Sequence, residues 1–220
     1  MEIITGIEQG TIEWKRIRHA KVGGSSSKDV LVKDLEDSAI FHKICGEMCE
    51  DFDEYETSFV NEAMERGNNL EPLARIELEK LKGIKLLVPA WIQSDIPILG
   101  ISPDGINEEN TFAGEFKCPA KNTYNKYMAN NRLLVDDYAP QIADYFAVVP
   151  TLEKLYMCAY RPEHRFCKFI CVEVTRDFLF NNGTVKTPKM YTIGELANDI
   201  RVRAIELQTM CNEQIEKYKF

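Results

Sequence analysis

The sequence has 220 residues, enough to bury one sizeable core, so we expect a single domain over residues 1–220. Its net charge is −8, from 27 Lys and Arg against 35 Asp and Glu, which argues against a protein that coats nucleic acid with a basic surface. No apolar run approaches the roughly 18 residues of a membrane span, and the start, MEIITGIEQG, lacks the features of a signal peptide, so we expect a cytoplasmic location and no membrane partner.

The first part of the chain is predicted to be mainly helical. Residues 11–20 read as a short helix, and the Gly-Ser-rich residues 22–29 as a loop. Residues 35–50 carry apolar side chains at helical spacing, which predicts a second helix. A longer helix is expected over residues 56–83, with Gly83 as its end.

Short strands are predicted next. Five segments are rich in β-forming residues and bounded by Pro, Gly, Asn or Asp: 85–93, 96–102, 111–118, 154–162 and 166–174. A helical stretch over 138–149 separates the third segment from the fourth, and an amphipathic helix over 193–220 ends the chain. This order predicts an α/β fold with a central mixed β-sheet flanked by helices.

Seven cysteines could be buried thiols or part of a metal site. The odd number and the expected reducing location argue against a disulfide framework. Cys45 with Cys49, and Cys167 with Cys171, are spaced so that both thiols lie on one face of a helix or strand. Buried thiols are the simpler interpretation, and a metal or iron–sulfur site is the alternative, without the CxxC spacing that would favour it.

The stretch SPDGINEENTFAGEFKCP, residues 102–119, carries the residues that suggest chemistry. A Pro-Asp-Gly turn holds Asp104 at the end of an apolar segment. Glu115 and Lys117 are two residues apart, so on a strand they point to the same face. Two carboxylates suit Mg²⁺ or Mn²⁺, and the carbonyl of Phe116 could add a third oxygen. Lys117 could then orient or activate a water for attack on a phosphodiester.

Each fragment alone also has a simpler interpretation. Asp-Gly commonly forms a hairpin turn, and Glu-x-Lys on a strand is commonly a solvated cross-strand pair. Together the fragments are more informative, because Glu115 and Lys117 alternate with the apolar Phe116 and Cys118. Glu71, in RGNNLEPLA, offers a third carboxylate to the same site.

Five segments, in order, resemble the phage lambda exonuclease family, which is the YqaJ-like viral recombinase family of the PD-(D/E)xK nucleases. They are EQGTIEWKRIR with VGGSSS, RGNNLEPLA, SPDG, EFKCP and YAPQIADY. The resemblance covers roughly residues 5–175 and implies a restriction-endonuclease-like core. The family often has Thr-Ala-Ser where this chain has Gly23-Gly24-Ser25, and the C-terminal third carries no motif of the family.

The resemblance implies a Mg²⁺-dependent exonuclease, with Mn²⁺ as a possible substitute. Such an enzyme degrades one strand of linear double-stranded DNA from 5′ to 3′ and leaves a 3′ single-stranded tail for an annealing protein. Similar enzymes of this size form a ring of three subunits around DNA, so a homotrimer is implied here. For a phage-encoded protein, the location would be the host cytoplasm.

The resemblance also implies a site made of acidic metal ligands, a lysine and two helix residues: Asp104, Glu115, Glu71, Lys117, Gln141 and Tyr145. Glu71 would be an outer or second-metal ligand. Gln141 and Tyr145 are four residues apart, so they share one face of a helix and would position the lysine or the scissile phosphate. For Tyr145 alone, a role as a core aromatic residue is the simpler interpretation.

Three further residues are assigned DNA contacts by the resemblance. Arg18 and Ser25 would bind the terminal 5′-phosphate, with Ser26 or Ser27 as substitutes for Ser25. Met64 lies seven residues before Glu71, and similar enzymes have an apolar wedge there that parts the terminal base pair. A buried core methionine is the alternative.

Other functions remain open at this point. Another PD-(D/E)xK nuclease, namely an endonuclease, a junction resolvase or an iron–sulfur nuclease, would use the same core residues. The iron–sulfur type needs a late cysteine cluster, which Cys158, Cys167 and Cys171 match poorly. A non-catalytic DNA-end-binding module is a further alternative, against which the intact acidic residues and lysine argue.

Overall fold

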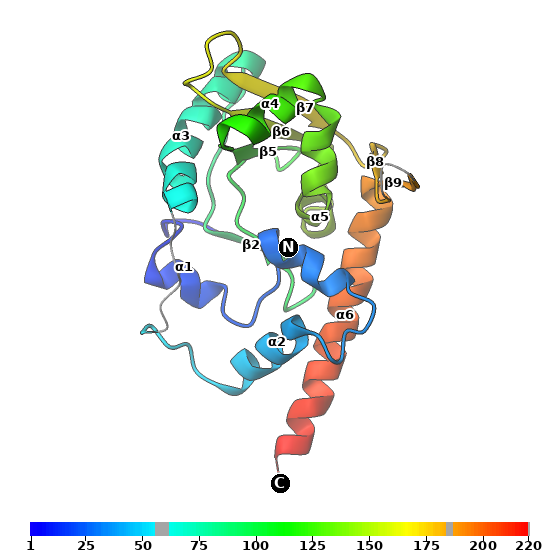
Figure 1. The fold of residues 1–220 in the computed structure, drawn as a ribbon. Coiled ribbons are helices and arrows are strands. Elements are labelled where there is room, and N and C mark those ends of the chain that lie inside the picture. The colour runs from blue at the N-terminus through cyan, green and yellow to red at the C-terminus, as the bar shows by residue number, and fades with distance from the viewer. Residues whose placement is uncertain (56–61, 184–186, 220) are drawn as a thin grey trace.

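The computed structural model describes residues 1–55, 62–183 and 187–219. Within these ranges, four strands form the central sheet in the order β4-β5-β6-β7, with bounds Gly105–Ile106, Phe112–Lys117, Lys154–Tyr160 and Phe169–Val174. Strand β5 runs parallel to β6, whereas β4 and β7 run antiparallel to their neighbours. The predicted mixed α/β fold is therefore confirmed (Figure 1).

Helices account for much of the remaining chain. They are α1 (Ile12–Ile17), a 3-10 helix η1 (Gly24–Leu31), α2 (Ala39–Cys49), α3 (Glu62–Lys82), α4 (Lys121–Ala129), α5 (Arg132–Val148) and α6 (Ile193–Tyr218). None of the described helices is both long and apolar enough to cross a membrane. The predicted helix over 56–83 is observed from Glu62, and its first six positions, 56–61, lie outside the described residues.

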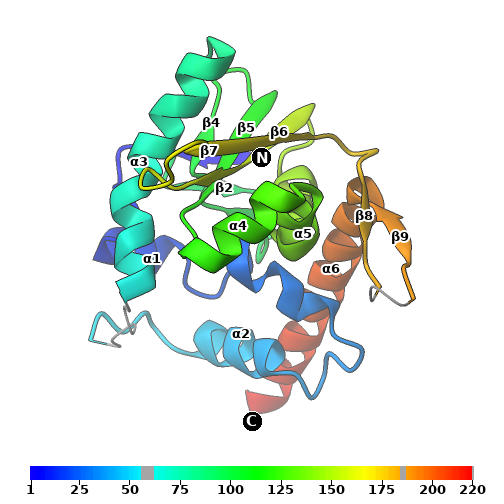
Figure 2. The same cartoon turned by 45° about the horizontal axis from the view of Figure 1, so that its top comes forward.

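The sheet separates two apolar clusters. Phe116 and Cys158 pack with Ala74 and Leu78 of α3, whereas Ala113 and Met157 belong to the larger cluster that includes α5. Alternate residues of a strand point to opposite faces, so this pattern places Glu115 and Lys117 on the α5 face. Figure 2 shows α4 and α5 together and α6 beside α5.

Two smaller sheets complete the strands of the described ranges. Strands β1 (Glu2–Ile4), β2 (Trp91–Gln93) and β3 (Gly100–Ile101) pair antiparallel, as do β8 (Leu179–Asn181) and β9 (Met190–Thr192). The strands predicted over 85–93 and 96–102 are shortened to their C-terminal parts. Pro89 and Pro97 precede these parts, and proline cannot donate a ladder hydrogen bond.

Three local predictions were wrong. The Gly-Ser-rich segment expected to be a loop forms η1. Helix α4 was not predicted, since its sequence, KNTYNKYMA, is polar and Ala120 before it offers no capping side chain. Helix α5 begins at Arg132, six residues before the predicted start, and is bent at Tyr138, where the backbone is not helical. Pro140 follows the bend and can donate no helical hydrogen bond.

Candidate active site

The candidate site lies on the α5 face of the central sheet. Asp104 occupies the turn between β3 and β4, and Glu115 and Lys117 lie at the carboxyl end of β5. Helix α5 covers this face and contributes Gln141 and Tyr145. Direct hydrogen bonds thus connect five of the six residues that the sequence assigned to the site, all except Glu71.

Glu115 is the centre of this network and is only 1% exposed. Its Oε1 accepts hydrogen bonds from Lys117 Nζ and from Gln141 Nε2, the latter at 2.7 Å. Its Oε2 accepts one from the Tyr145 hydroxyl at 2.7 Å. A buried carboxylate is stable only when it is paired and hydrogen-bonded, and these three donors meet that need.

Asp104 is held from three directions. Its Oδ2 accepts the Phe116 N–H at 2.8 Å, and its own N–H donates to the Tyr145 hydroxyl at 3.2 Å. Its carbonyl accepts a hydrogen bond from Arg75 Nη1 of α3 at 3.0 Å. The Tyr145 hydroxyl therefore connects both acidic residues, because it accepts from Asp104 and donates to Glu115.

The carboxylates repel one another. Burial, followed by the charges of Glu115 and Glu71, raises the pKa of Asp104 well above its usual value. Burial and Glu115 likewise raise the pKa of Glu71 to about 7, against the opposing effects of Arg75 and Lys117. Glu71 therefore shares the electrostatic environment of the site from α3.

Lys117 is the cation of the site. Burial by itself would lower its pKa, but Glu115 and Asp104 more than offset this and raise the pKa above its usual value. Its Nζ also lies 4.9 Å from the centre of the Tyr138 ring, where α5 bends. Lys117 is thus an ammonium group, suited to orient a water or to offset negative charge rather than to accept a proton.

The donor set suits a hard divalent cation. Asp104, Glu115 and Glu71 bring an excess of negative charge together, and their mutual repulsion adds to burial in raising the pKa of Asp104 and Glu71. A bound divalent cation would relieve this repulsion. Over the ranges 1–55, 62–183 and 187–219, no three His, Cys, Asp or Glu side chains are arranged to hold a metal ion. Both oxygens of Glu115 bind protein donors, so metal binding would require them to exchange partners.

The N-terminal segment supports the Asp104 turn. Gln9 Nε2 donates to the carbonyls of Pro89 and Pro103, both at 3.0 Å. Trp14 Nε1 donates to Ser102 Oγ at 2.8 Å, and Ser102 in turn donates to the Ala90 carbonyl at 2.7 Å. The contacts of Gln9 and Trp14 were not predicted, because they join residues between 80 and 94 positions apart.

The two residues assigned to the 5′-phosphate, Arg18 and Ser25, are related through Asp144. Arg18 stacks 4.2 Å from the Trp14 ring centre, and burial lowers its pKa while Asp144 opposes this. Asp144 Oδ2 accepts the Gly24 N–H at 2.6 Å, directly before the exposed Ser25. The Gly24 amide is therefore paired with Asp144. No direct contact between Arg18 and Ser25 is observed among the described residues.

Asp144 was missed by the sequence analysis. It is fully buried in α5, and its pKa is raised to about 7 chiefly by burial. The Ser27 hydroxyl is close enough to lower this pKa, yet neither Ser27 Oγ nor Asp144 Oδ1 makes a well-formed hydrogen bond. The signal was an acidic residue inside an apolar stretch, IADYFAVV, where a charge is costly unless it has a partner.

Met64 and the cysteines lie outside the central network. Met64 is 49% exposed near the start of α3, so it is not a buried core residue. All seven cysteines are free. Cys158 and Cys171 face each other across β6 and β7, and burial with this pairing raises the pKa of Cys158.

Comparison with known proteins identifies one matching family. A family model described as the YqaJ-like viral recombinase domain matches residues 13–151. No curated protein matches the sequence.

The fold resembles three solved exonuclease structures. LHK-Exo, an alkaline exonuclease from Laribacter hongkongensis, has a TM-score of 0.72 and 22% identity, with 94% of this chain and 98% of that chain covered. LHK-Exo in complex with dAMP has a TM-score of 0.71 and 21% identity at the same coverage. A phage related exonuclease from Haemophilus somnus 129PT has a TM-score of 0.57 and 13% identity, covering 91% and 97%. At these identities the likeness establishes a shared fold.

Proposed function

Since this chain belongs to the YqaJ-like viral recombinase family, we propose that it is a metal-dependent exonuclease that degrades one strand of linear double-stranded DNA from 5′ to 3′. The chain would act as a single domain over residues 1–220, built on a restriction-endonuclease-like core. It would work in the cytoplasm of a host cell. The other PD-(D/E)xK activities and a non-catalytic end-binding role are the alternatives that the experiment below distinguishes.

The observation that carries the proposal is the buried network around Glu115. Two acidic residues and a lysine meet on one face of the sheet and share hydrogen bonds with Gln141 and Tyr145. A solvated ion pair with only a structural role would lie on the surface, whereas Glu115 is 1% exposed. A buried cluster of interacting charges of this kind is typical of catalytic sites.

Asp104, Glu115, Glu71 and the carbonyl of Phe116 would hold Mg²⁺, or Mn²⁺ in its place. When bound, this ion would polarise a phosphoryl oxygen and favour ionisation of a water. Lys117 would orient the attacking water and offset charge on the phosphate through its ammonium group. Gln141 and Tyr145 would keep Glu115 in position through the hydrogen bonds described above.

The chemistry would be hydrolysis at the first internucleotide phosphate. The water oxygen bonds to phosphorus, the bond from phosphorus to the 3′ oxygen of the terminal nucleotide breaks, and a 5′-mononucleotide leaves. The phosphate stays on the next nucleotide as a new 5′ end, which Arg18 and Ser25 would hold. The complex of LHK-Exo with dAMP is compatible with this product class. Met64 would part the terminal base pair.

The assembly would include further partners. A ring of three subunits would keep the enzyme on its DNA, which suits a chain of net charge −8. The 3′ single-stranded tail would pass to an annealing protein.

The test uses linear duplexes labelled at either 5′ or 3′ end, and a closed circle, with Mg²⁺. We expect immediate release of the 5′ label, late release of the 3′ label and an intact circle. Lys117→Ala should slow turnover at least about a hundredfold while DNA binding persists. Lys126→Ala is the control, since Lys126 pairs with Asp137 on the surface.

Cleavage of the circle would identify an endonuclease. Near wild-type turnover of Lys117→Ala would remove the assigned role of Lys117. DNA-end binding with no cleavage under any divalent ion would favour the non-catalytic module.

A further inference from the structure

The hairpin that joins β6 to β7, residues 161–168, presents an aromatic side chain to solvent. Phe166 is 93% exposed, which makes it the most exposed large hydrophobic residue of those the structure describes. Strands β5 and β6 are parallel, with Lys117 opposite Ala159. The hairpin that follows β6 therefore leaves the sheet at the same strand ends as Lys117. An isolated exposed phenylalanine is ordinary, but this position beside the site is not.

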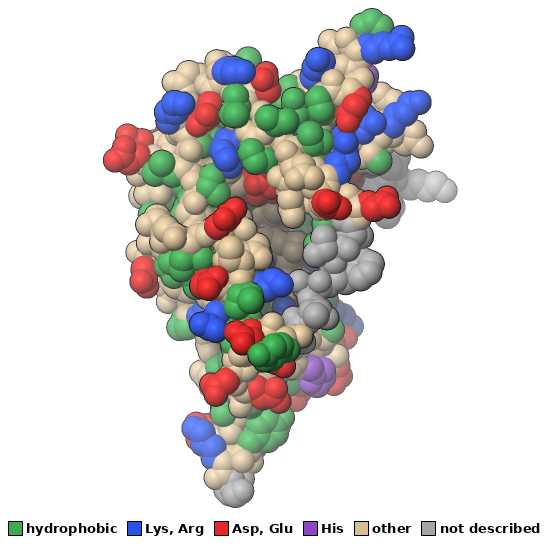
Figure 3. Space-filling model, turned by 90° about the vertical axis from the view of Figure 1, so that its left-hand side faces the viewer, with side chains coloured by type: hydrophobic (Ala, Val, Ile, Leu, Met, Phe, Trp, Pro, Cys, Tyr) green, Lys and Arg blue, Asp and Glu red, His purple; other side chains and the backbone are tan. Residues whose placement is uncertain are grey.

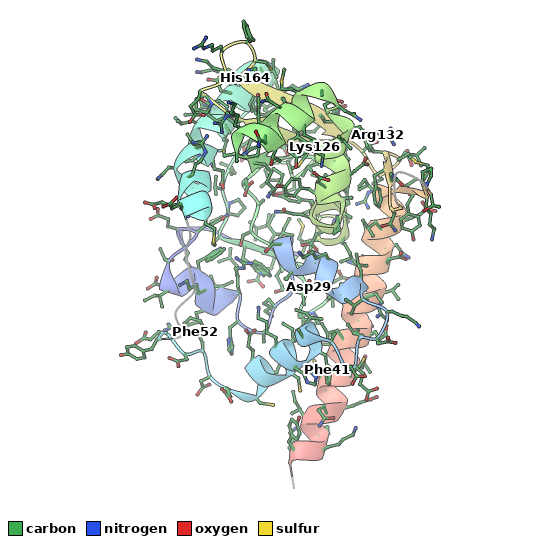
Figure 4. All side chains as sticks on the ribbon, viewed as in Figure 1. Asp29, Phe41, Phe52, Lys126, Arg132 and His164 are labelled. Atoms are coloured by element: carbon green, nitrogen blue, oxygen red, sulfur yellow. The ribbon has the colours of Figure 1, made fainter. Side chains whose placement is uncertain are left out.

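The hairpin is held by specific hydrogen bonds. Arg161 N–H donates to the Lys168 carbonyl at 2.9 Å and closes the loop. His164 Nδ1 accepts the Phe166 N–H at 3.4 Å and the Cys167 N–H at 3.1 Å. Figure 4 labels His164 in this loop at the top of the molecule. The backbone around Phe166 is therefore fixed, and its exposure is a feature of the fold.

The hairpin is also attached to the elements that form the site. Arg66 of α3, five residues before Glu71, binds both oxygens of Glu163 at 2.8 and 3.0 Å. Arg161 Nη1 donates to the carbonyl of Pro119, two residues after Lys117, at 3.0 Å. The two contacts fix the hairpin relative to strand β5 and to helix α3.

The charge of the hairpin is opposite to that of the chain. Residues 161–168 contain three cations and one acid, Glu163, which Arg66 pairs. Arg165 and Lys168 are exposed, and neither forms an ion pair within the described part of the chain. Figure 3, which looks onto the left-hand side of Figure 1, shows Lys and Arg side chains gathered at the top of the molecule. A local excess of cations on a chain of net charge −8 favours a polyanionic ligand.

We propose that the hairpin tip binds unpaired nucleotides of DNA next to the active site, with Phe166 stacked on a base and Arg165 and Lys168 on the phosphates. An exposed ring can stack only on a base whose face is open, so an unpaired strand fits and an intact duplex does not. The proposal rests on the proposed function for the source of that strand. The binding itself requires no cleavage.

The test measures binding of a short labelled oligo(dT) strand by fluorescence anisotropy in EDTA, which prevents hydrolysis. Phe166→Ala should weaken binding about fivefold or more, as expected for loss of one stacked base. Phe166→Trp should restore it. Tyr218→Ala is the matched control, because Tyr218 is 60% exposed at the end of α6, at the opposite end of the molecule from the hairpin (Figure 1).

The phosphate contacts have their own measurement. Affinity falls as salt rises, and each phosphate contact on a single strand contributes about 0.7 to the steepness of log affinity against log salt. Arg165→Glu and Lys168→Glu should each make this dependence less steep by about 0.7. Lys219→Glu, on the exposed end of α6, should leave the slope unchanged.

A direct readout comes from the tryptophan fluorescence of the Phe166→Trp variant, taken as the difference from wild type, which contains Trp14 and Trp91. A change on adding oligo(dT) supports stacking, and an unchanged spectrum with the strand bound overturns it. If Phe166→Ala instead lowers the molecular mass in light scattering and leaves oligo(dT) binding intact, the tip contacts a second copy and the proposal is wrong. Loss of cleavage in Lys117→Ala with normal oligo(dT) binding keeps this test separate from that of the nuclease activity.

Discussion

At the level of single residues, the Tyr145 hydroxyl connects the two acidic residues that the sequence placed in the site. It donates to Glu115 Oε2 and accepts the Asp104 N–H. Burial, followed by the charges of Glu115 and Asp104, raises the pKa of Tyr145 well above its usual value, so the hydroxyl keeps its proton. Tyr145 thus has a polar role at the site besides its packing in the core.

We expect Tyr145→Phe to lower both stability and turnover. The change leaves the Asp104 N–H without its acceptor, and an unsatisfied buried group costs about 1–3 kcal/mol. Urea denaturation and single-turnover cleavage measure the two effects. Tyr191 of β9 donates its hydroxyl to Asp199 of α6, and Tyr191→Phe, which loses this bond, should leave turnover unchanged. Wild-type stability and turnover in Tyr145→Phe would show that the bridge is unimportant.

Arg18 should distinguish DNA ends. A terminal phosphate carries more negative charge than an internal one, and a charge-assisted hydrogen bond contributes about 1.5–3 kcal/mol. We expect wild type to digest 5′-phosphorylated duplexes roughly ten- to a hundredfold faster than 5′-hydroxyl duplexes. Arg18→Ala should flatten this ratio, and Arg18→Lys should keep part of it, because lysine retains the charge without the planar group stacked on Trp14. Equal rates on both ends in wild type would remove the phosphate pocket.

Asp144 should make stability depend on pH. Its pKa is raised from 3.8 to about 7 in the folded protein, so the folded state holds its proton more tightly than the unfolded state. The resulting stabilisation is complete below pH 3.8 and is lost as the pH rises through about 7. Asp144→Asn has no such titration, so wild type should lose a few kcal/mol relative to this variant between these values. Urea denaturation across the range measures the difference, and a constant difference would contradict the prediction.

At the level of elements, helix α5 organises the site. Gln141 and Tyr145 bind Glu115, while Asp144 turns toward the N-terminal segment and binds Gly24. One helix therefore positions both the Glu115 carboxylate and the segment assigned to the 5′-phosphate. Any shift of α5 relative to the sheet would disturb both regions together.

The approach of η1 to β3 depends on a glycine. A Cβ at Gly23 would lie 1.7 Å from the Gly100 carbonyl oxygen, so the backbone would have to move. We expect Gly23→Ala to cost about 1–3 kcal/mol or more. Gly46→Ala is the matched control, because a Cβ there meets nothing within 4 Å inside α2. That change should stabilise the protein by about 0.5–1 kcal/mol. Equal stability of the two variants would refute the close-contact argument.

At the level of the whole molecule, net charge and assembly belong together. With a net charge of −8, the chain repels DNA at long range except near local cations such as those of the hairpin. Bound divalent ions, a closed ring or these local cations would each favour stable engagement with a long duplex.

The proposed ring of three subunits makes a simple prediction. In solution, light scattering should give three times the 25.3 kDa mass of one chain. Digestion should then be processive, with most duplexes intact while a few are fully shortened. A monomeric mass with processive digestion would show that something other than a ring retains the DNA.

Features that depend on local pattern could be predicted from the sequence. The spacing of Glu115 and Lys117 put both on one face of a strand, the Pro-Asp-Gly turn held Asp104, and helical periodicity placed α2, α3 and α6 to within a few residues where they are described. The mixed α/β class and the family likeness followed from the order of such segments, whereas the order of the strands in the sheet did not. These features need only neighbours along the chain, whose geometry is set by the backbone periods of two and 3.6 residues.

Contacts between groups far apart in the sequence could not be predicted and are known from the fold. The Tyr145 hydroxyl reaches Glu115 across 30 positions, and the Gly24 amide reaches Asp144 across 120. The polar helix α4 and the hairpin beside Lys117 likewise depend on contacts with segments far away in sequence. Local propensity carries no record of such partners, because a buried polar group is satisfied by whatever donor or acceptor the fold brings to it.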